Sequence, residues 1–216
     1  MTAKTFTVIC AATLAAFLAG CGSSVMLDPP TIPTPLINKI PASVGLRIPA
    51  EFESFVHSEE VIGRKHWKID LGRSNAALFT QLFAYMFEKV TVLDADDDAS
   101  LLSLDALIEP SIDAFEFSVP NQTKTEAFAV WIRYRLKVYN ADGTVVANWP
   151  VSAYGKSQSG GGTDALRRAA VLAMRDAAAL IIMKLDDETG ISARISSVAA
   201  ASVAVQTPQP ATTDEE

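Results

Sequence analysis

The residues best suited to binding chemistry lie in one stretch, from Glu126 to Tyr139, where two kinds of side chain alternate. Every second residue is apolar or aromatic: Phe128, Val130, Ile132, Tyr134, Leu136 and Val138. Between them lies a cationic and aromatic set: Trp131, Arg133, Arg135, Lys137 and Tyr139. This period of two predicts a β-strand with one face in the core and the other in solvent. A cationic face with aromatic ends suits a carboxylate or phosphate on a glycan or lipid, or a protein partner.

The same five side chains also have a purely structural explanation. Charged residues on an exposed sheet discourage pairing with other chains. Long basic side chains can also lie beneath a covering helix while their charges stay in water. The two explanations differ in one expectation: reversing the charges of Arg133 and Arg135 abolishes function only if the face binds something.

Other groups that could do chemistry are few and poorly arranged. His57 and His66 flank Glu59 and Glu60 and could form a metal or acid–base site, but the polar surroundings favour an exposed loop. The run from Asp94 to Asp98 lacks the spacing, glycine and terminal glutamate of an EF-hand. We therefore expect no metal site and no cofactor.

The segment Gly155-Lys156-Ser157 has the last three residues of a phosphate-binding loop. That loop needs a glycine five residues before its final glycine, and position 150 is a proline. Gly155 to Ser159 also lacks the closing glycine of a nucleophile elbow. We therefore expect that the protein is not an enzyme. A hydrolase with an unrecognised site at His57 or His66 is kept as an alternative.

The N-terminus carries the most specific motif of the chain. Residues 1–4 include one positive charge, and residues 5–17 are mostly apolar but too few to span a bilayer. They lead into Leu18-Ala19-Gly20-Cys21. An aliphatic residue, two small residues and a cysteine in this position resemble the lipobox of bacterial lipoproteins. An ordinary signal peptide with an incidental cysteine is the alternative.

The resemblance implies cleavage before Cys21, a diacylglycerol on its thiol and a third acyl chain on the new amine. Two or more chains hold a protein stably on a membrane, because each buried methylene contributes about 0.8 kcal/mol. Gly22 stands where enterobacterial lipoproteins of the inner membrane have aspartate, so the resemblance implies the periplasmic face of the outer membrane in a Gram-negative bacterium. The membrane is thus the first expected partner, and an envelope protein the second.

Composition narrows the other partners. The formal net charge of the 216 residues is -7, which argues against nucleic acid, because binding phosphates takes clustered Lys and Arg. Both cysteines, Cys10 and Cys21, precede the body of the chain. The body therefore relies on an apolar core rather than on disulfides or thiolate-bound metal.

The pattern along the chain divides it into four parts. Residues 1–20 form the signal peptide, and residues 21–42 form a Pro-rich tether expected to be extended, although residues 36–40 could instead pack on the domain. Residues 43–188 form a single globular domain. Residues 189–216 are small, polar and acidic, and are expected to be a disordered tail.

Periodicity within residues 43–188 predicts strands and helices in a mixed order. The expected strands are 43–48, 65–71, 90–93, 106–108, 112–119, 126–139 and 144–156, with a break at Pro110. The expected helices are 74–89, capped by Ser74 or Asn75, and 163–185. The fold class is α+β: a mixed, mostly antiparallel sheet of about five strands with two helices packed on one face.

Three features together resemble the small α/β lipoproteins of the Gram-negative envelope: the lipobox, the hairpin turn at Asn140-Ala141-Asp142-Gly143, and the closing helix that ends in residues 181–185. This group includes the lipopolysaccharide-assembly lipoprotein and the auxiliary lipoproteins of ABC-type transporters. The resemblance assigns a role to Cys21 alone. It implies a non-enzymatic accessory subunit in the assembly or transport of envelope components. The alternative is a lipid- or glycan-binding module that uses the basic-aromatic face.

Overall fold

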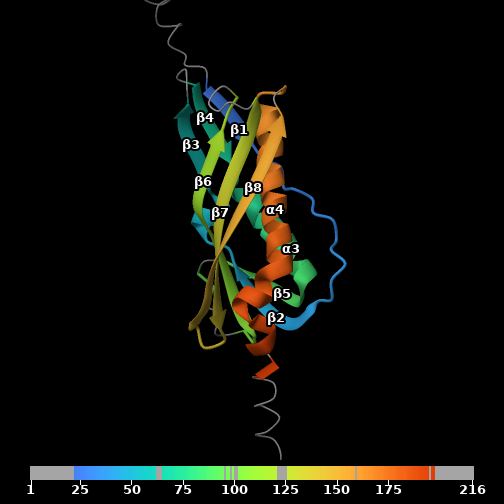
Figure 1. Ribbon diagram of the computed structural model, residues 1–216. Helices are drawn as coiled ribbons and strands as arrows, with labels where there is room; N and C mark the ends of the chain where they lie inside the picture. The colour runs from blue at the N-terminus through green and yellow to red at the C-terminus, as the bar shows by residue number, and fades with distance from the viewer. Residues whose placement is uncertain are drawn as a thin grey trace, which may run out of the picture.

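The computed structural model describes residues 22–61, 65–94, 96–97, 99, 102–120, 126–158, 160–194 and 196–197. The signal peptide and Cys21 lie outside these residues, so their assignment stays a prediction. The described part is an elongated α+β fold with two sheets, in which the long strands and α4 run along the same direction (Figure 1).

The larger sheet has five strands in the order β5-β2-β6-β7-β8. Their bounds are β2, Ile40–Arg47; β5, Phe87–Leu93; β6, Ala106–Ser118; β7, Ala127–Asn140; and β8, Val145–Gln158. β2 runs parallel to both β5 and β6, whereas β6, β7 and β8 are antiparallel. A mixed five-stranded sheet is confirmed, but its pairings are evenly divided rather than mostly antiparallel. Both parallel pairs join strands that are far apart in sequence, and the chain between the paired strands includes α3 in each case.

A second, three-stranded sheet was not predicted. Its order is β1 (Gly22–Met26), β4 (Lys65–Asp70) and β3 (Val56–Val61), with β1 parallel and β3 antiparallel to β4. Trp67 of β4 contacts Phe117 of β6 and Phe128 of β7, with ring centroids 6.0 and 6.2 Å apart. The small sheet therefore packs on the large one through aromatic side chains.

The expectation of a free tether is wrong for residues 22–32. Val25, Leu27 and Ile32 are buried in the core, and the Ser74 hydroxyl donates a hydrogen bond to the Leu27 carbonyl. The physical reason is that β4 would otherwise present unpaired backbone groups on one edge. The few apolar residues between the prolines are enough to hold the segment against that edge.

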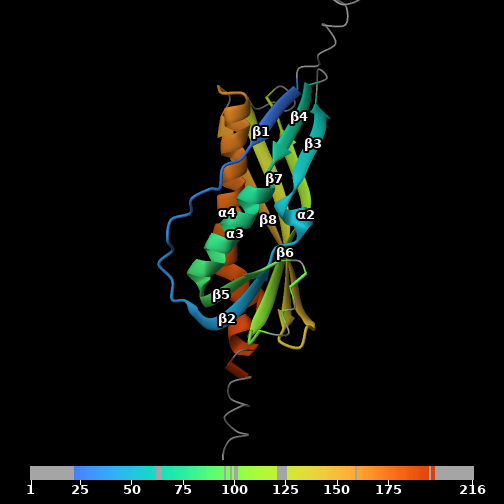
Figure 2. The same ribbon diagram turned by 180° about the vertical axis from the view of Figure 1, so that it is seen from behind.

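Two helices flank the large sheet on the same side (Figure 2): α3 (Gly72–Met86) and α4 (Thr163–Thr189). α4 lies along β7 and β8 and faces them with buried alanines: Ala165, Ala169, Ala173 and Ala177. A Cβ at Gly155 of β8 would lie 2.0 Å from the Ala169 carbonyl oxygen and 2.4 Å from the Ala173 nitrogen. Gly155 thus lets the helix backbone approach the strand, which is its role in place of a phosphate loop.

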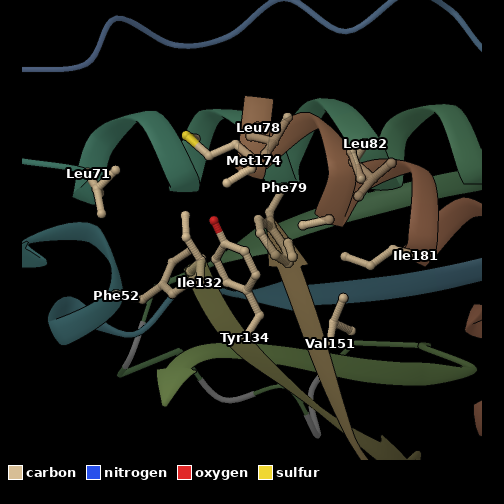
Figure 3. Packing of buried hydrophobic residues seen from close by; sticks show 14 of the residues in the cluster. Phe52, Leu71, Leu78, Phe79, Leu82, Ile132, Tyr134, Val151, Met174 and Ile181 are labelled. Atoms are coloured by element: carbon tan, nitrogen blue, oxygen red, sulfur yellow. The ribbon is translucent and has the colours of Figure 1, made fainter. Parts of the chain in front are cut away.

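Tyr134 of β7 joins this sheet to α3 inside the core (Figure 3). Its ring lies 5.3 Å from that of Phe79, and its hydroxyl donates a 2.7 Å hydrogen bond to Asn75 Oδ1. Burial raises the pKa of Tyr134 far above its usual range. Ser74 and Asn75 were expected to cap the helix, but α3 begins before both of them, and their side chains serve tertiary contacts instead.

The expected break at Pro110 is absent, because β6 continues from Ala106 to Ser118. β2 pairs only with residues 106–108 of β6. Pro110 lies beyond that ladder with β7 as its one neighbour, a position where a missing N–H is tolerated.

The end of the domain extends further than predicted. α4 includes Thr189, and Ile191 after it is buried in the core, so the first residues of the expected tail belong to the fold. Residues 198–216 lie outside the described part. Among the described residues, no helix is both long and apolar enough to cross a membrane.

Candidate binding face

The sheet formed by β6, β7 and β8 has an inner face, under α4 and the small sheet, and an outer face that carries Trp131, Arg133 and Arg135. The inner residues of β7 from Val130 to Val138 are buried, while Trp131 and Arg133 are exposed. The predicted alternation is therefore confirmed. The same alternation places Ala127 and Ala129 on the solvent side, but both are buried, so the exposed part of the face begins at Trp131.

A second aromatic side chain, which was not predicted, stands beside Trp131 on the outer face. Tyr154 of β8 pairs directly with Trp131; the ring centroids are 5.1 Å apart and the planes tilted by 46°. Trp131 is 44% exposed and Tyr154 is 43% exposed. The Tyr154 backbone N–H donates a 2.9 Å hydrogen bond to Asp176 of α4, which fixes this part of the edge strand. The pair forms an exposed aromatic platform on two paired strands.

A shallow hollow of about 290 Å³ adjoins the platform. Its polar lining comes from Glu116, Arg133 and Ser152. Arg133 is exposed and has no ion-pair partner among the described residues. We call Trp131, Arg133 and Tyr154 the platform site, because together they offer two aromatic rings and an uncommitted positive charge.

Arg135, unlike Arg133, already has its guanidinium paired with a carboxylate. Its Nε donates a 3.0 Å hydrogen bond to Asp113 Oδ1, its Nη2 contacts the other carboxylate oxygen, and its Nη1 donates to Asn148 at 3.3 Å. The hydrogen bond with Asp113 raises the pKa of Arg135 further. A bidentate carboxylate neutralises this guanidinium, so Arg135 contributes little charge to the outer face.

Lys137 and Tyr139 lie toward the far end of the strand. Lys137 is partly exposed and stands opposite Glu109. The Tyr139 hydroxyl donates a long 3.4 Å hydrogen bond to Glu109, which also lies 3.8 Å from Arg47. Burial, and then the charge of Glu109, raise the pKa of Tyr139. Arg47 and Tyr139 line a separate hollow of about 390 Å³.

The five predicted residues therefore do not form one patch. Eight residues separate Trp131 from Tyr139, which is roughly 26 Å along a strand. Trp131 and Arg133 belong to the platform site with Tyr154, Arg135 is paired with Asp113, and Tyr139 belongs to the far hollow.

The two histidines are not brought together. His57 pairs with Ile69 and His66 pairs with Glu60, which places the two side chains on opposite faces of the small sheet. The His57 ring lies on Phe115, 4.9 Å between centroids, and its Nε2 is 3.1 Å from a Glu59 oxygen. No group of three metal-binding side chains occurs in the described part of the chain.

The acidic run forms a turn rather than a cation site where it is described. The Asp94 N–H donates a 2.9 Å hydrogen bond to the Asp97 carboxylate, and Arg47 donates to the Asp97 carbonyl at 3.2 Å. These contacts use the carboxylate and the carbonyl within the fold. Asp98, the last residue of the run, lies outside the described residues.

Several solved structures resemble this one. A DUF330 protein from Xanthomonas campestris matches with a TM-score of 0.51 at 14% identity, over 82% of this chain and 99% of its own. A hypothetical protein from Chlamydia trachomatis matches with a TM-score of 0.45 at 10% identity, over 69% and 98%. A minor lipoprotein from Acinetobacter baumannii matches with a TM-score of 0.39 at 12% identity, over 72% and 94%.

The likeness to the Xanthomonas protein shows a shared fold that spans nearly all of that protein. At this identity it concerns the fold alone. No protein-family model matches the sequence, and no curated protein matches it. The function therefore has to be argued from the residues themselves.

Proposed function

We propose that this chain is a non-enzymatic lipoprotein of the Gram-negative cell envelope, anchored through acyl chains on Cys21 to the periplasmic face of the outer membrane. There it acts as an accessory subunit that binds an envelope protein and assists the assembly or transport of an envelope component. The platform site is the surface that meets the partner.

The observation that carries the proposal is the exposed pair of Trp131 and Tyr154. Trp, Tyr and Arg are the residues that most often dominate protein interfaces. The two rings already lie against each other at 5.1 Å, and both stand on paired strands. Binding therefore orders little that was mobile, so most of the free energy of desolvating the rings is available for affinity.

The lipobox supports the location. Leu18-Ala19-Gly20-Cys21 precedes the folded domain. The net charge of the whole chain is negative, so charge alone does not favour binding to anionic lipid. Covalent acyl chains provide the attachment instead.

The test is crosslinking and affinity purification of the acylated full-length protein from native membranes, followed by mass spectrometry. We expect a stoichiometric envelope protein with the wild type. Trp131→Ala should reduce its recovery at least 10-fold, since losing a dominant interface residue costs about 2 kcal/mol. Val145→Ala is the matched control, because Val145 is 56% exposed on the same strand as Tyr154. Unchanged recovery with Trp131→Ala contradicts the proposal.

Charge reversal gives a second, independent reading of the same site. Arg133→Glu reverses an uncommitted charge and should reduce recovery of the partner. Arg135→Glu breaks the contact with Asp113 and places two carboxylates side by side, so Arg133→Glu alone is the cleaner test of the platform site. If cells carrying the double variant retain full function, the cationic side chains serve solvation only.

A lipid- or glycan-binding module is the alternative, and the tilt of the two rings over the hollow favours it. An aromatic face next to a cation can hold an apolar ring face and an anionic substituent together. Mass spectrometry of an organic extract from the purified protein distinguishes this function. A bound lipid or glycan that disappears in Trp131→Ala, with no protein partner recovered, would favour the alternative.

A further inference from the structure

We infer that the domain stands directly on the bilayer on one defined end, the end where β1 begins, with no spacer between the acylated cysteine and the fold. This inference rests on the proposed acylation of Cys21. Its structural ground is that Gly22, which is bonded to Cys21, is already the first residue of β1.

β1 is fastened to the domain over its whole length. Its residues pair in register with residues 66–70 of β4. The Leu27 N–H continues the ladder to the Asp70 carbonyl at 3.2 Å, and Arg167 of α4 donates to the Met26 carbonyl at 3.2 Å. One residue reaches at most about 3.6 Å. The acylated residue is therefore held within a few ångströms of the start of β1.

The contacts of β1 identify the end that faces lipid. Ser23 pairs with Trp67, whose ring contacts Phe117 near the end of β6 and Phe128 near the start of β7. Gln158, the last residue of β8, pairs with the first residue of β7. Figures 1 and 2 both show the start of β1 at the same end as the beginning of α4. We call this the anchor end.

The turn at residues 141–143, between β7 and β8, lies at the opposite end (Figure 1). β7 has 14 residues, so the two ends are separated by roughly 45 Å along the strand at about 3.3 Å per residue. Trp131 lies four residues from the start of β7, roughly 13 Å from the anchor end. A partner at the platform site would meet this protein close to the membrane surface.

The charges that the structure describes at this end do not explain the orientation by themselves. The exposed charged residues described at the anchor end include both signs: Glu60, Lys68, Glu126, Lys156, Asp164 and Arg168. Opposite charges close together give little net attraction to an anionic surface. The short covalent connection is what directs this end toward lipid.

The mature chain makes a clean test possible, because it has no cysteine after Cys21. Gln158→Cys places a fluorophore at the anchor end and Ala141→Cys places one at the opposite end; both residues are exposed. The acylated full-length protein is reconstituted in vesicles of phosphatidylethanolamine and phosphatidylglycerol that carry a nitroxide on the headgroup. We expect the label at 158 to be quenched several-fold more strongly than the label at 141.

A matched variant removes the constraint. Twenty Gly and Ser residues, beginning with Gly, are inserted between Cys21 and Gly22, which gives a link of about 25 Å root-mean-square span. Quenching at 158 should then fall toward that at 141. Equal quenching of the two labels without the insertion, or no effect of the insertion, overturns the inference.

Flotation of the same vesicles distinguishes this failure from failure of the proposed function. The wild type should float with the vesicles, and Cys21→Ser should not. If the wild type does not float, the acyl anchor itself is refuted, and the inference with it. If it floats but the two labels are quenched equally, only the orientation is refuted.

Discussion

The two faces of β7 differ in burial and in the partners of their side chains, although their residues alternate along one strand. On the inner face, the side chains of Ile132, Tyr134 and Leu136 are at most 1% exposed, and the Tyr134 hydroxyl donates a hydrogen bond to Asn75. On the outer face, Trp131 remains nearly half exposed and Arg133 has no ion-pair partner among the described residues. The inner face carries stability, and the outer face is free to carry recognition.

This difference makes a specific expectation about substitutions. A change on the inner face should alter the free energy of unfolding and affect binding only through the fold. A change at Trp131 or Arg133 should reduce binding and leave the free energy of unfolding nearly unchanged. Four measurements, taken from the largest expected effect on stability to the smallest, can break or sharpen this division.

Gly155→Ala should be the most destabilising. The added methyl group would lie 2.0 Å from the Ala169 carbonyl oxygen and 2.4 Å from the Ala173 nitrogen. These are backbone atoms, so α4 itself must move, and we expect a loss of about 3 kcal/mol or more in urea denaturation. Lys156→Ala, at the exposed neighbouring position, should stay within about 0.5 kcal/mol. A wild-type midpoint for Gly155→Ala would mean that α4 does not pack this closely.

Tyr134→Phe should cost about 2 kcal/mol at pH 8. It keeps the ring but removes the donor to Asn75 Oδ1, which leaves a buried acceptor without its hydrogen bond. Asn75 Nδ2 already lacks a partner among the described residues, so the variant leaves both polar atoms of this buried amide without the hydrogen bonds described here. Thermal and urea unfolding should agree on the loss. An effect below about 0.5 kcal/mol would show that water replaces the bond.

The same residue predicts a dependence on alkaline pH. Burial raises the pKa of Tyr134 in the folded protein, whereas the unfolded chain titrates near 10. Above about pH 10 the unfolded state loses this proton while the folded state keeps it, so stability falls as pH rises. The difference between wild type and Tyr134→Phe should therefore shrink between pH 9 and 11. A constant difference would indicate that the hydroxyl is accessible to solvent.

Trp131→Ala should have the smallest effect on stability, about 0.5 kcal/mol, from the lost contact with the Tyr154 ring. The same substitution has the largest expected effect on recovery of the partner. Circular dichroism melting, beside the purification experiment, measures both. A loss above about 2 kcal/mol would place Trp131 in the core and remove the distinction between the faces.

Local spacing was enough to predict several elements. The alternation in β7, the helical spacing of α3 and the turn at residues 140–143 each depend on neighbours in sequence. The turn, for instance, uses Gly143 at a φ of +81° and hydrogen bonds from Thr144 to the Asp142 carboxylate. Those hydrogen bonds lower the pKa of Asp142. Such features require no knowledge of the rest of the fold.

Residues 22–32 show what local spacing in the sequence could not predict. Their prolines and scarce apolar residues are typical of an extended linker, and an extended segment is also what a parallel strand needs. Whether it pairs depends on the free edge of β4, about 40 residues away in the sequence. The same holds for Arg135, whose charge is committed only because Asp113 lies on the next strand.

The sequence by itself determined which residues of β7 share a face, because the period of two is a property of the strand. Only the tertiary structure decided what stands beside them. At the turn Tyr139 pairs with Val145, but Val138 pairs with Ala147, so β8 holds one extra residue. That shift turns Tyr154, rather than Ala153, to the side of Trp131, because one residue of register exchanges the two faces of a strand.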